Sequence, residues 1–240
     1  MGARRHRHQE PYPSAFGGPV NADLTPTPPG SVTGGRTIGR LLRVNTTSEK
    51  PRWWQVLGSL PVAAAVLVAG NALYILLVAV GNITDYGTNF AFVQHVLSMD
   101  TTNFGGAPGA DLDPDVMWRS LSDPTVWNVA YIGVIVWESL AAVVLLLACV
   151  AWLRALASGG TFDRARALSS IGLLMIIALF FGGFIAVGGE WFEMWRSTAW
   201  NGLDPAFRNS VLAGVTLILI HSSSSAWDRH VRPDHDLAPR

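Results

Sequence analysis

Long uncharged runs dominate the chain from residue 56 onward. No residue from Val56 to Val80 is charged, and the run from Trp127 to Leu153 contains one charge, Glu138. A third run, from Leu168 to Gly189, again contains none. As helices rising about 1.5 Å per residue, these runs are long enough to cross the roughly 30 Å of hydrocarbon in a bilayer. We therefore predict transmembrane helices over 56–80, 127–153 and 168–189.

A fourth apolar run is shorter and needs a polar extension to cross a bilayer. Val211 to Ile220 is apolar, but His221 and the serines 222–225 follow it. Serine hydroxyls can bond to carbonyls of their own helix, and Trp227 supplies an interfacial side chain. We expect a fourth span over 206–227. The predicted fold is an all-α membrane protein built as a four-transmembrane-helix bundle.

A shorter periodic segment lies between the first two spans. Apolar side chains recur there at helical spacing and polar ones fall opposite; the apolar set is Phe92, Val93, Val96 and Leu97. This pattern predicts a short amphipathic extracytoplasmic helix over about 89–99. In the spans, small residues four apart, such as Ala65 with Ala69 and Ala178 with Gly182 and Ala186, are expected to line helix contacts.

The two ends of the chain differ from this pattern. Residues 1–52 are rich in Pro and Gly, start with several arginines and show almost no apolar periodicity, which predicts a disordered cytoplasmic tail before the transmembrane domain 53–227. Within this tail, the segment Arg36–Val44 mixes Ile and Leu with Arg, so it is either a lipid-headgroup contact or a solvated linker. Residues 228–240 form a second, C-terminal cytoplasmic tail.

Composition agrees with a membrane class. Half of the 240 residues are hydrophobic and 14% are charged, whereas about a quarter are charged in soluble domains. The formal net charge is zero, so no global field favours nucleic acid. Cys149 is the only cysteine, which excludes an intrachain disulfide and a thiolate metal cage.

Charge placement predicts an orientation. Arg154, Arg164 and Arg166 lie between the second and third spans, while the connection 81–126 carries six aspartates against one arginine, Arg119. Cytoplasmic loops are enriched in Lys and Arg. We therefore expect a multi-pass protein of the cell (inner or plasma) membrane with both termini cytoplasmic. The lipid bilayer is its expected partner, together with a further membrane protein or a second copy of the chain.

Glu138 is the sharpest single polar feature, because a carboxylate deep in a span is costly and often functional. Removal from water disfavours its charged form. It is a candidate proton relay or ligand counter-ion. A structural hydrogen bond to another helix, for example to Asn71, is the alternative.

Further candidates gather where spans end on the predicted outer side. The residues expected to bind a ligand or partner are Asp85, Tyr86, His95, Asp100, Glu190, Trp191, Glu193, Trp195 and Asn201. Asp85, His95, Glu190 and Glu193 have the donor types of a cation site, but their spacing is not diagnostic of a metal. Helix capping and interfacial hydrogen bonding are the ordinary alternative, and we assign no metal.

No enzyme motif is found: the chain lacks a nucleophile elbow, a phosphate loop, a dinucleotide fingerprint and a zinc-protease helix. We assign no catalytic residue and no cofactor. Haem is disfavoured because His95 falls outside the spans and His221 at an end of one, so paired axial histidines are missing.

Several motifs carry a family resemblance. The long run Asn82–Thr102, the triplet Met117-Trp118-Arg119 and the run Gly188–Ser197 resemble the domain of unknown function 2165 (DUF2165) family of predicted small integral membrane proteins. This resemblance implies a four-helix membrane protein from bacteria with its motifs on the outer face. It implies no activity, because the family has none assigned.

Two hypotheses about function follow. The first is a binding or interaction role, as an accessory subunit whose outer-face cluster recognises a partner or a small ligand. The alternative is proton-coupled transport of a small solute, with Glu138 as the relay and the outer carboxylates as an entry funnel.

Overall fold

The computed structural model describes residues 53–227. The predicted tails, 1–52 with its Arg36–Val44 segment and 228–240, lie outside the described residues. The described chain is helical, in the order α1 (Trp53–Leu57), α2 (Leu60–Thr84), α3 (Tyr86–Ser98), η1 (Met117–Arg119), α4 (Pro124–Ser158), α5 (Asp163–Ile177), η2 (Ala178–Trp191), η3 (Met194–Arg196) and α6 (Leu203–His221).

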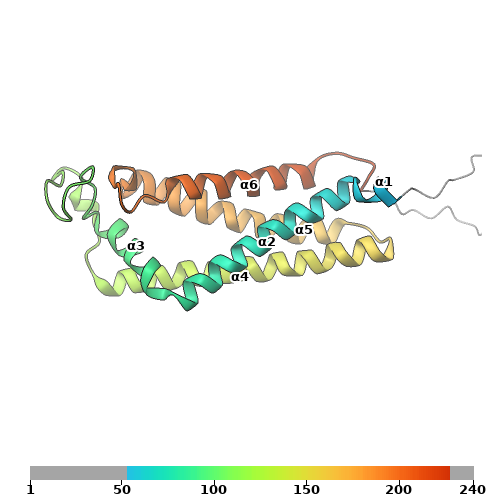
Figure 1. Ribbon diagram of the computed structural model, residues 1–240, viewed down its shortest axis with the longest axis horizontal. Helices are drawn as coiled ribbons and strands as arrows, with labels where there is room; N and C mark the ends of the chain where they lie inside the picture. The colour runs from blue at the N-terminus through green and yellow to red at the C-terminus, as the bar shows by residue number, and fades with distance from the viewer. Residues whose placement is uncertain (1–52, 228–240) are drawn as a thin grey trace, which may run out of the picture. The chain divides into compact units, whose positions relative to one another are not determined.

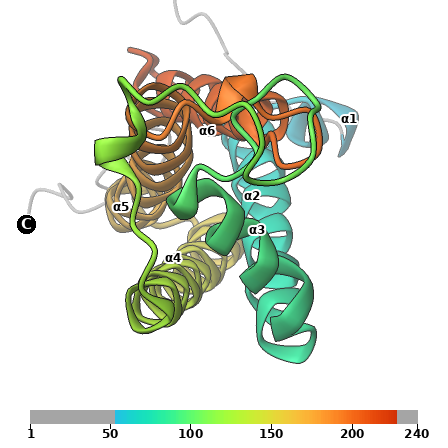
Figure 2. The same cartoon turned by 90° about the vertical axis from the view of Figure 1, so that its left-hand side faces the viewer.

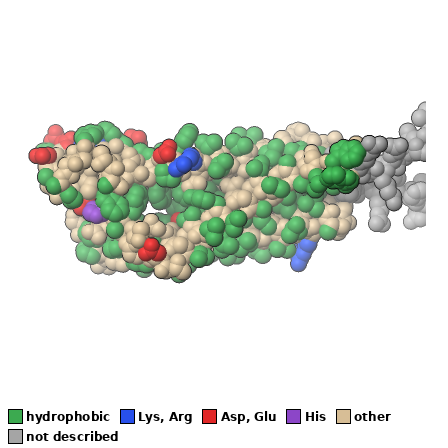
Figure 3. Space-filling model, in the orientation of Figure 1, with side chains coloured by type: hydrophobic (Ala, Val, Ile, Leu, Met, Phe, Trp, Pro, Cys, Tyr) green, Lys and Arg blue, Asp and Glu red, His purple; other side chains and the backbone are tan. Residues whose placement is uncertain are grey.

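Four of these helices are long and apolar enough to cross a membrane: α2, α4, the continuous helix formed by α5 and η2, and α6. They run side by side along the long axis of the bundle (Figure 1). Their outward side chains are largely hydrophobic (Figure 3), and Leu77, Leu153 and Ile218 are 60%, 67% and 73% exposed. An apolar surface of this extent is unfavourable in water and favourable in contact with lipid. The predicted four-helix membrane fold is confirmed.

The bundle has two different ends. We call the end with α3 and the connections 99–123 and 192–202 the loop end, and the opposite end, with α1 and the turn 159–162, the tail end. Acidic side chains gather at the loop end (Figure 3). Seen from that end, α3 lies across the middle of the bundle (Figure 2). α3 agrees with the predicted amphipathic helix but begins three residues earlier, at Tyr86.

Small side chains bring the helices together. On α2 the buried face is Ala64, Val68, Ala72, Ile75 and Ala79, and on α4 it includes Ala141, Ala142 and Ala148. Small residues let helix backbones approach closely in lipid. Of the expected pair, Ala65 is partly buried and packs against the core, whereas Ala69 lies on the exposed side of α2.

The second half of the third spanning helix is wound more widely than an α-helix. Its hydrogen bonds reach back five residues, as from Phe192 N to Val187 O at 3.0 Å. Wider turns change which side chains share a face, so the four-residue spacing of Ala178, Gly182 and Ala186 does not define a buried stripe. Leu179, Phe180, Gly188 and Gly189 are buried instead. Such widened turns occur often at functional sites.

The bounds of all four spanning helices differ from the prediction. α4 and the helix formed by α5 and η2 extend beyond the predicted spans 127–153 and 168–189 at both ends. α2 begins after a break at Gly58 and Ser59 and continues to Thr84, beyond the expected end at residue 80. α6 stops at His221, so the serine run does not extend it; Ser222 is extended and its Oγ donates to Leu219 O at 2.7 Å.

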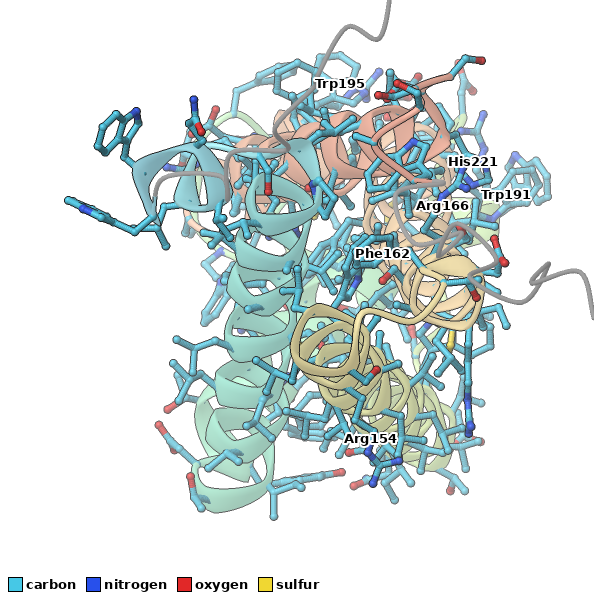
Figure 4. The ribbon with its side chains drawn as sticks, turned by 90° about the vertical axis from the view of Figure 1, so that its right-hand side faces the viewer. Arg154, Phe162, Arg166, Trp191, Trp195 and His221 are labelled. Carbon is cyan, nitrogen blue, oxygen red and sulfur yellow. The ribbon has the colours of Figure 1, made fainter. Side chains whose placement is uncertain are left out.

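The serine run instead forms a turn that returns Trp227 to the bundle. Trp227 is buried, not interfacial as expected, with its ring 6.1 Å from Trp152 and 6.2 Å from Phe162. Arg166 lies over the same ring at 5.0 Å and donates to Ile220 O at 2.7 Å. Phe162 and Arg166 are seen from this end in Figure 4. The tail end is therefore closed by aromatic packing.

We predict that Gly172→Ala lowers the melting temperature of the purified protein. A Cβ at this position would lie 2.5 Å from Leu145 Cγ, inside the α4–α5 contact, and overpacking typically costs about 1–3 kcal/mol. Gly214→Ala is the control, because a Cβ there meets nothing within 4 Å. Equal melting temperatures for the two variants would show that α4 and α5 are not packed this closely.

Candidate functional site

A cavity of about 230 Å³ lies in the bundle beneath α3. All four spanning helices and α3 contribute side chains to it. Its polar lining consists of Tyr74, Asn82, Asn89, Tyr131, Glu138 and Asn209. Polar side chains converging on a largely apolar cavity between bundle helices are typical of a ligand site.

A chain of hydrogen bonds leads from α3 to Glu138. Asn89 Nδ2 donates to Asn82 Oδ1 at 2.6 Å, and Asn82 Nδ2 donates to Glu138 Oε2 at 2.7 Å. Glu138 is only 2% exposed. Its second oxygen, Oε1, forms no hydrogen bond with the described residues, and the Glu138 side chain lines the cavity. One carboxyl oxygen is thus fixed by the protein and the other is free to accept from a bound molecule.

Glu138 is hydrogen-bonded to another helix, as one alternative expected, but the partner is Asn82 and not Asn71, the residue given as an example. Asn71 donates to Leu67 O at 2.9 Å and to Thr216 Oγ1 at 3.1 Å, which joins α2 to α6. Glu138 faces Asn82 because the antiparallel packing of α2 and α4 brings it opposite the last turn of α2. Asn71 therefore has a structural role in this fold.

Aromatic rings form the other walls of the cavity. Phe92 on α3 stacks on Phe184 with centroids 6.0 Å apart, and Phe180 lies 5.5 Å from Phe184. Tyr131 donates to Asn82 O at 3.3 Å, and Asn209 donates to Tyr74 OH at 2.6 Å.

An apolar pocket of about 140 Å³ adjoins the cavity, and Phe92, Val93, Val134 and Phe184 line both. Since two of these four residues belong to α3, that helix is a shared wall of the two spaces. The apolar side of α3 therefore faces these two spaces, which explains its amphipathic pattern.

At the loop end, His95 and Asp100 are paired with each other. His95 Nδ1 lies 2.8 Å from Asp100 Oδ1, and its ring stacks on Trp200 with centroids 4.6 Å apart. Both candidate residues therefore have a structural role: they pair with each other, and His95 packs the start of the connection after α3 against Trp200.

Glu193 is held between two arginines. Arg119 Nη1 donates to its Oε1 at 3.4 Å, and Arg196 Nε lies 2.9 Å from Oε2 in an ion pair without hydrogen-bond geometry. Glu193 is 8% exposed and has a left-handed backbone with φ of 50°, a conformation that a non-glycine residue keeps only when its surroundings hold it.

Arg196 also binds the long connection between α3 and α4. Its Nη1 donates to Asp113 Oδ2 at 3.1 Å and holds the pKa of that carboxyl below its usual value, with help from the backbone N–H of Asp115. In addition, Phe104 N donates to Arg196 O at 3.0 Å. Asp113 is therefore ionised at neutral pH and ties its loop to the bundle.

The two arginines come from a four-residue repeat. Met117–Ser120 and Met194–Ser197 have the same sequence, Met-Trp-Arg-Ser, and each forms a tight helical turn closed by a bond from the Ser N–H to the Met carbonyl. Both segments belong to the motifs of the family resemblance, but no prediction used the repeat. This repeat could have predicted from the sequence that Arg119 and Arg196 occupy equivalent turns.

The remaining loop-end candidates do not converge on one point. Asp85 and Glu190 are exposed, Tyr86 donates to Asn128 Oδ1 at 3.0 Å, and Asn201 Oδ1 accepts from Leu203 N at the start of α6. Trp191 and Trp195 flank Arg119 and Arg196 at 5.4 and 5.2 Å.

The cation site considered from the sequence is not assembled. Within residues 53–227, no three His, Cys, Asp or Glu side chains come close enough to share a metal ion. The physical reason is that His95 and Glu193 are already paired with Asp100 and with the two arginines.

Sequence reasoning missed most of the cavity. Asn82, Asn89, Tyr74, Tyr131 and Asn209 were not among the candidates, although Asn82 begins the long motif of the resemblance. Asn82 and Asn89 are seven residues apart, on either side of the break at Asp85. Only the turn between α2 and α3 brings their side chains together.

The family model described as predicted small integral membrane protein, DUF2165, matches residues 60–223. This is more than half of the chain. The chain belongs to this family. The matched residues of the DUF2165 family cover both the cavity and the loop-end ion pairs, and the family's description names no activity. Comparison with curated proteins and with solved structures gives no match.

We predict that Glu193→Ala loosens the loop end. Loss of this carboxylate leaves two largely buried arginines without their shared counter-charge, which costs roughly 1–3 kcal/mol. The expected result is a lower melting temperature and faster limited proteolysis within residues 99–123. Glu190→Ala, which removes an exposed carboxylate nearby, is the control. If both variants behave like the wild type, Glu193 does not hold this end together.

Proposed function

We propose that this protein binds a small organic ligand in the cavity beneath α3, with Glu138 as the recognition group, and that it is not an enzyme. The observation that carries this proposal is the state of the Glu138 carboxyl. One oxygen accepts from Asn82, the other forms no hydrogen bond with the described residues, and the side chain lines the cavity. Buried polar atoms normally have hydrogen-bond partners, so a carboxyl oxygen without one can accept a hydrogen bond from a ligand.

The walls define the chemistry of the ligand. A carboxyl beside Tyr74, Tyr131, Phe92, Phe180 and Phe184 suits a cationic amine, because an ammonium group pairs with carboxylate and is attracted to aromatic faces. The apolar part of such a ligand fits the adjoining pocket of about 140 Å³. A small amphipathic amine meets both requirements.

Proton-coupled transport through Glu138 remains an alternative, and one feature makes it the weaker one. The groups that connect α3 to Glu138 are the amides of Asn89 and Asn82. Amides hold fixed donor and acceptor ends and do not pass a proton along as carboxyl groups, hydroxyls or water do. The contact between these groups supports positioning of the carboxyl better than proton relay.

We predict that Glu138→Gln abolishes retention of a small-molecule amine. The wild type and this variant are purified from host membranes and denatured, and the released molecules are compared by mass spectrometry. At least a tenfold enrichment is expected with the wild type and is lost in Glu138→Gln, because the amide cannot pair with a cation.

Two further variants make this result specific. Val134→Trp fills the boundary of the two spaces and is expected to lose the molecule as well, whereas Glu190→Gln removes an exposed carboxylate and retains it. Absence of any enriched molecule, or equal enrichment in Glu138→Gln, contradicts the binding proposal. Ligand-driven proton uptake by wild-type liposomes that Glu138→Gln lacks would favour transport.

A second candidate function is association with a membrane-protein partner or a second copy through the loop end. Four aromatic side chains there are strongly exposed: Phe104, Trp118, Trp191 and Trp195, at 67%, 70%, 48% and 46%. They surround Arg119 and Arg196. Tryptophan and arginine dominate binding hot spots, although exposed aromatics also suit a membrane interface.

For this role we predict that blue-native electrophoresis of detergent-solubilised protein shows a species heavier than the monomer. The double change Trp118→Ala and Trp191→Ala should remove it, since these rings pack 5.6 Å apart on the exposed surface. Trp53→Ala, which alters an exposed ring at the tail end, is the control. A monomer throughout counts against partner association.

A further inference from the structure

A groove at the tail end runs between α4 and α5 and has a volume of about 320 Å³. Arg154 and Arg164 line it from the two helices, and Thr161 lies in the connecting turn. Deeper lining comes from Leu147, Val150 and Leu168. The groove therefore joins two cations to an apolar wall.

The two arginines differ from the others in the described part of the chain. The guanidinium groups of Arg119, Arg166, Arg196 and Arg208 each have a protein partner: Glu193, the Ile220 carbonyl, Asp113 and Asp204, respectively. Those of Arg154 and Arg164 make no ion pair or hydrogen bond with residues 53–227. Figure 4 shows Arg154 projecting away from the bundle, while Arg166 lies at the same end beside His221.

No carboxylate in the part of the chain that the structure describes forms an ion pair with either arginine. Asp163, which begins α5, precedes Arg164 directly in the chain, but its carboxylate forms no ion pair with the described residues. The Thr161 hydroxyl also lacks a hydrogen-bond partner within the described residues. Two guanidinium groups and one hydroxyl thus offer donors to an anion, and arginine is well suited to phosphate.

The depth of the groove distinguishes a lipid from a free anion. Leu147 lies two helical turns before Arg154 on α4, which places it about 10 Å further along the helix axis. Leu147 and Val150 are 53% and 43% exposed on the face that meets the bilayer. Charge at the rim and apolar wall about 10 Å deeper match a phosphate group followed by acyl chains.

We propose that this groove is a binding site for an anionic phospholipid, whose phosphate lies between Arg154 and Arg164 and whose acyl chain lies along Leu147, Val150 and Leu168. Basic pockets between transmembrane helices bind such headgroups on the cytoplasmic side, and the tail end is the side that the arginine distribution predicts to be cytoplasmic. The volume falls in the range of ligand sites, about 300–1,000 Å³. This site is separate from the cavity of the proposed function.

Native mass spectrometry of the full-length protein tests this proposal. The protein is equilibrated with equal amounts of phosphatidylglycerol and phosphatidylcholine in mixed micelles. The wild type is expected to retain phosphatidylglycerol preferentially, and the double variant Arg154→Gln and Arg164→Gln should retain at least about tenfold less. Arg208→Gln, which removes an arginine at the loop end, should behave as the wild type.

A second measurement uses the unaltered protein. Phenylglyoxal modification of Arg154 and Arg164 should be slower in phosphatidylglycerol vesicles than in phosphatidylcholine vesicles, with Arg208 unchanged. Equal lipid retention by the double variant and the wild type overturns the proposal. Protection of both arginines by inorganic phosphate alone, without a preference between the lipids, also overturns it, because the groove would then be an anion site and not a lipid site.

Discussion

Lipid offers no hydrogen bonds, so every polar group inside a spanning helix must find its partner within the protein. The bundle meets this constraint between helices: Asn71 donates to Thr216, Trp137 to the Met175 carbonyl, and Trp152 to Ser169. These bonds link α2 to α6 and α4 to α5, and they fix which faces meet. In Glu138 only one carboxyl oxygen, Oε2, has a partner within the described residues, the Asn82 amide. This unpaired oxygen distinguishes the cavity from the other polar contacts of the bundle, in which both groups are paired.

The loop end is organised by charge instead. Its connections are too long and too polar to be held by helix packing, and the two Met-Trp-Arg-Ser turns supply the arginines that Glu193 and Asp113 bind. These ion pairs use carboxylates that would otherwise be free for a cation. They also hold the connection that follows α3, the helix that covers the cavity. The segment that the DUF2165 family model matches thus includes residues whose role here is to hold the helix that covers a cavity.

The two ends therefore suit different partners. At the loop end arginines are paired with carboxylates and several aromatic rings are exposed. At the tail end Phe162 and Trp227 are buried, and two arginines have no partner within residues 53–227. A molecule bound at the tail end would have to bring negative charge. One bound beneath α3 would have to bring a hydrogen-bond donor or a positive charge. Because the two sites require ligands of opposite charge and lie in different parts of the bundle, the proposed ligand and lipid sites are independent of each other.

The sequence by itself determined the four spans, the amphipathic helix and the family, because lipid imposes long uncharged runs that are visible without any knowledge of packing. It also identified Glu138, since a single carboxyl in such a run stands out. The tertiary structure alone decided its partner: Asn82 rather than Asn71, through the antiparallel contact of α2 and α4. The tertiary structure also decided where α6 ends and that Trp227 packs against the bundle. Both depend on a turn in the serine run, and serines are compatible with a turn or with a longer helix. The cavity and the pairing of Glu193 join residues far apart in the chain, and hydrophobic periodicity carries no information about which distant side chains meet.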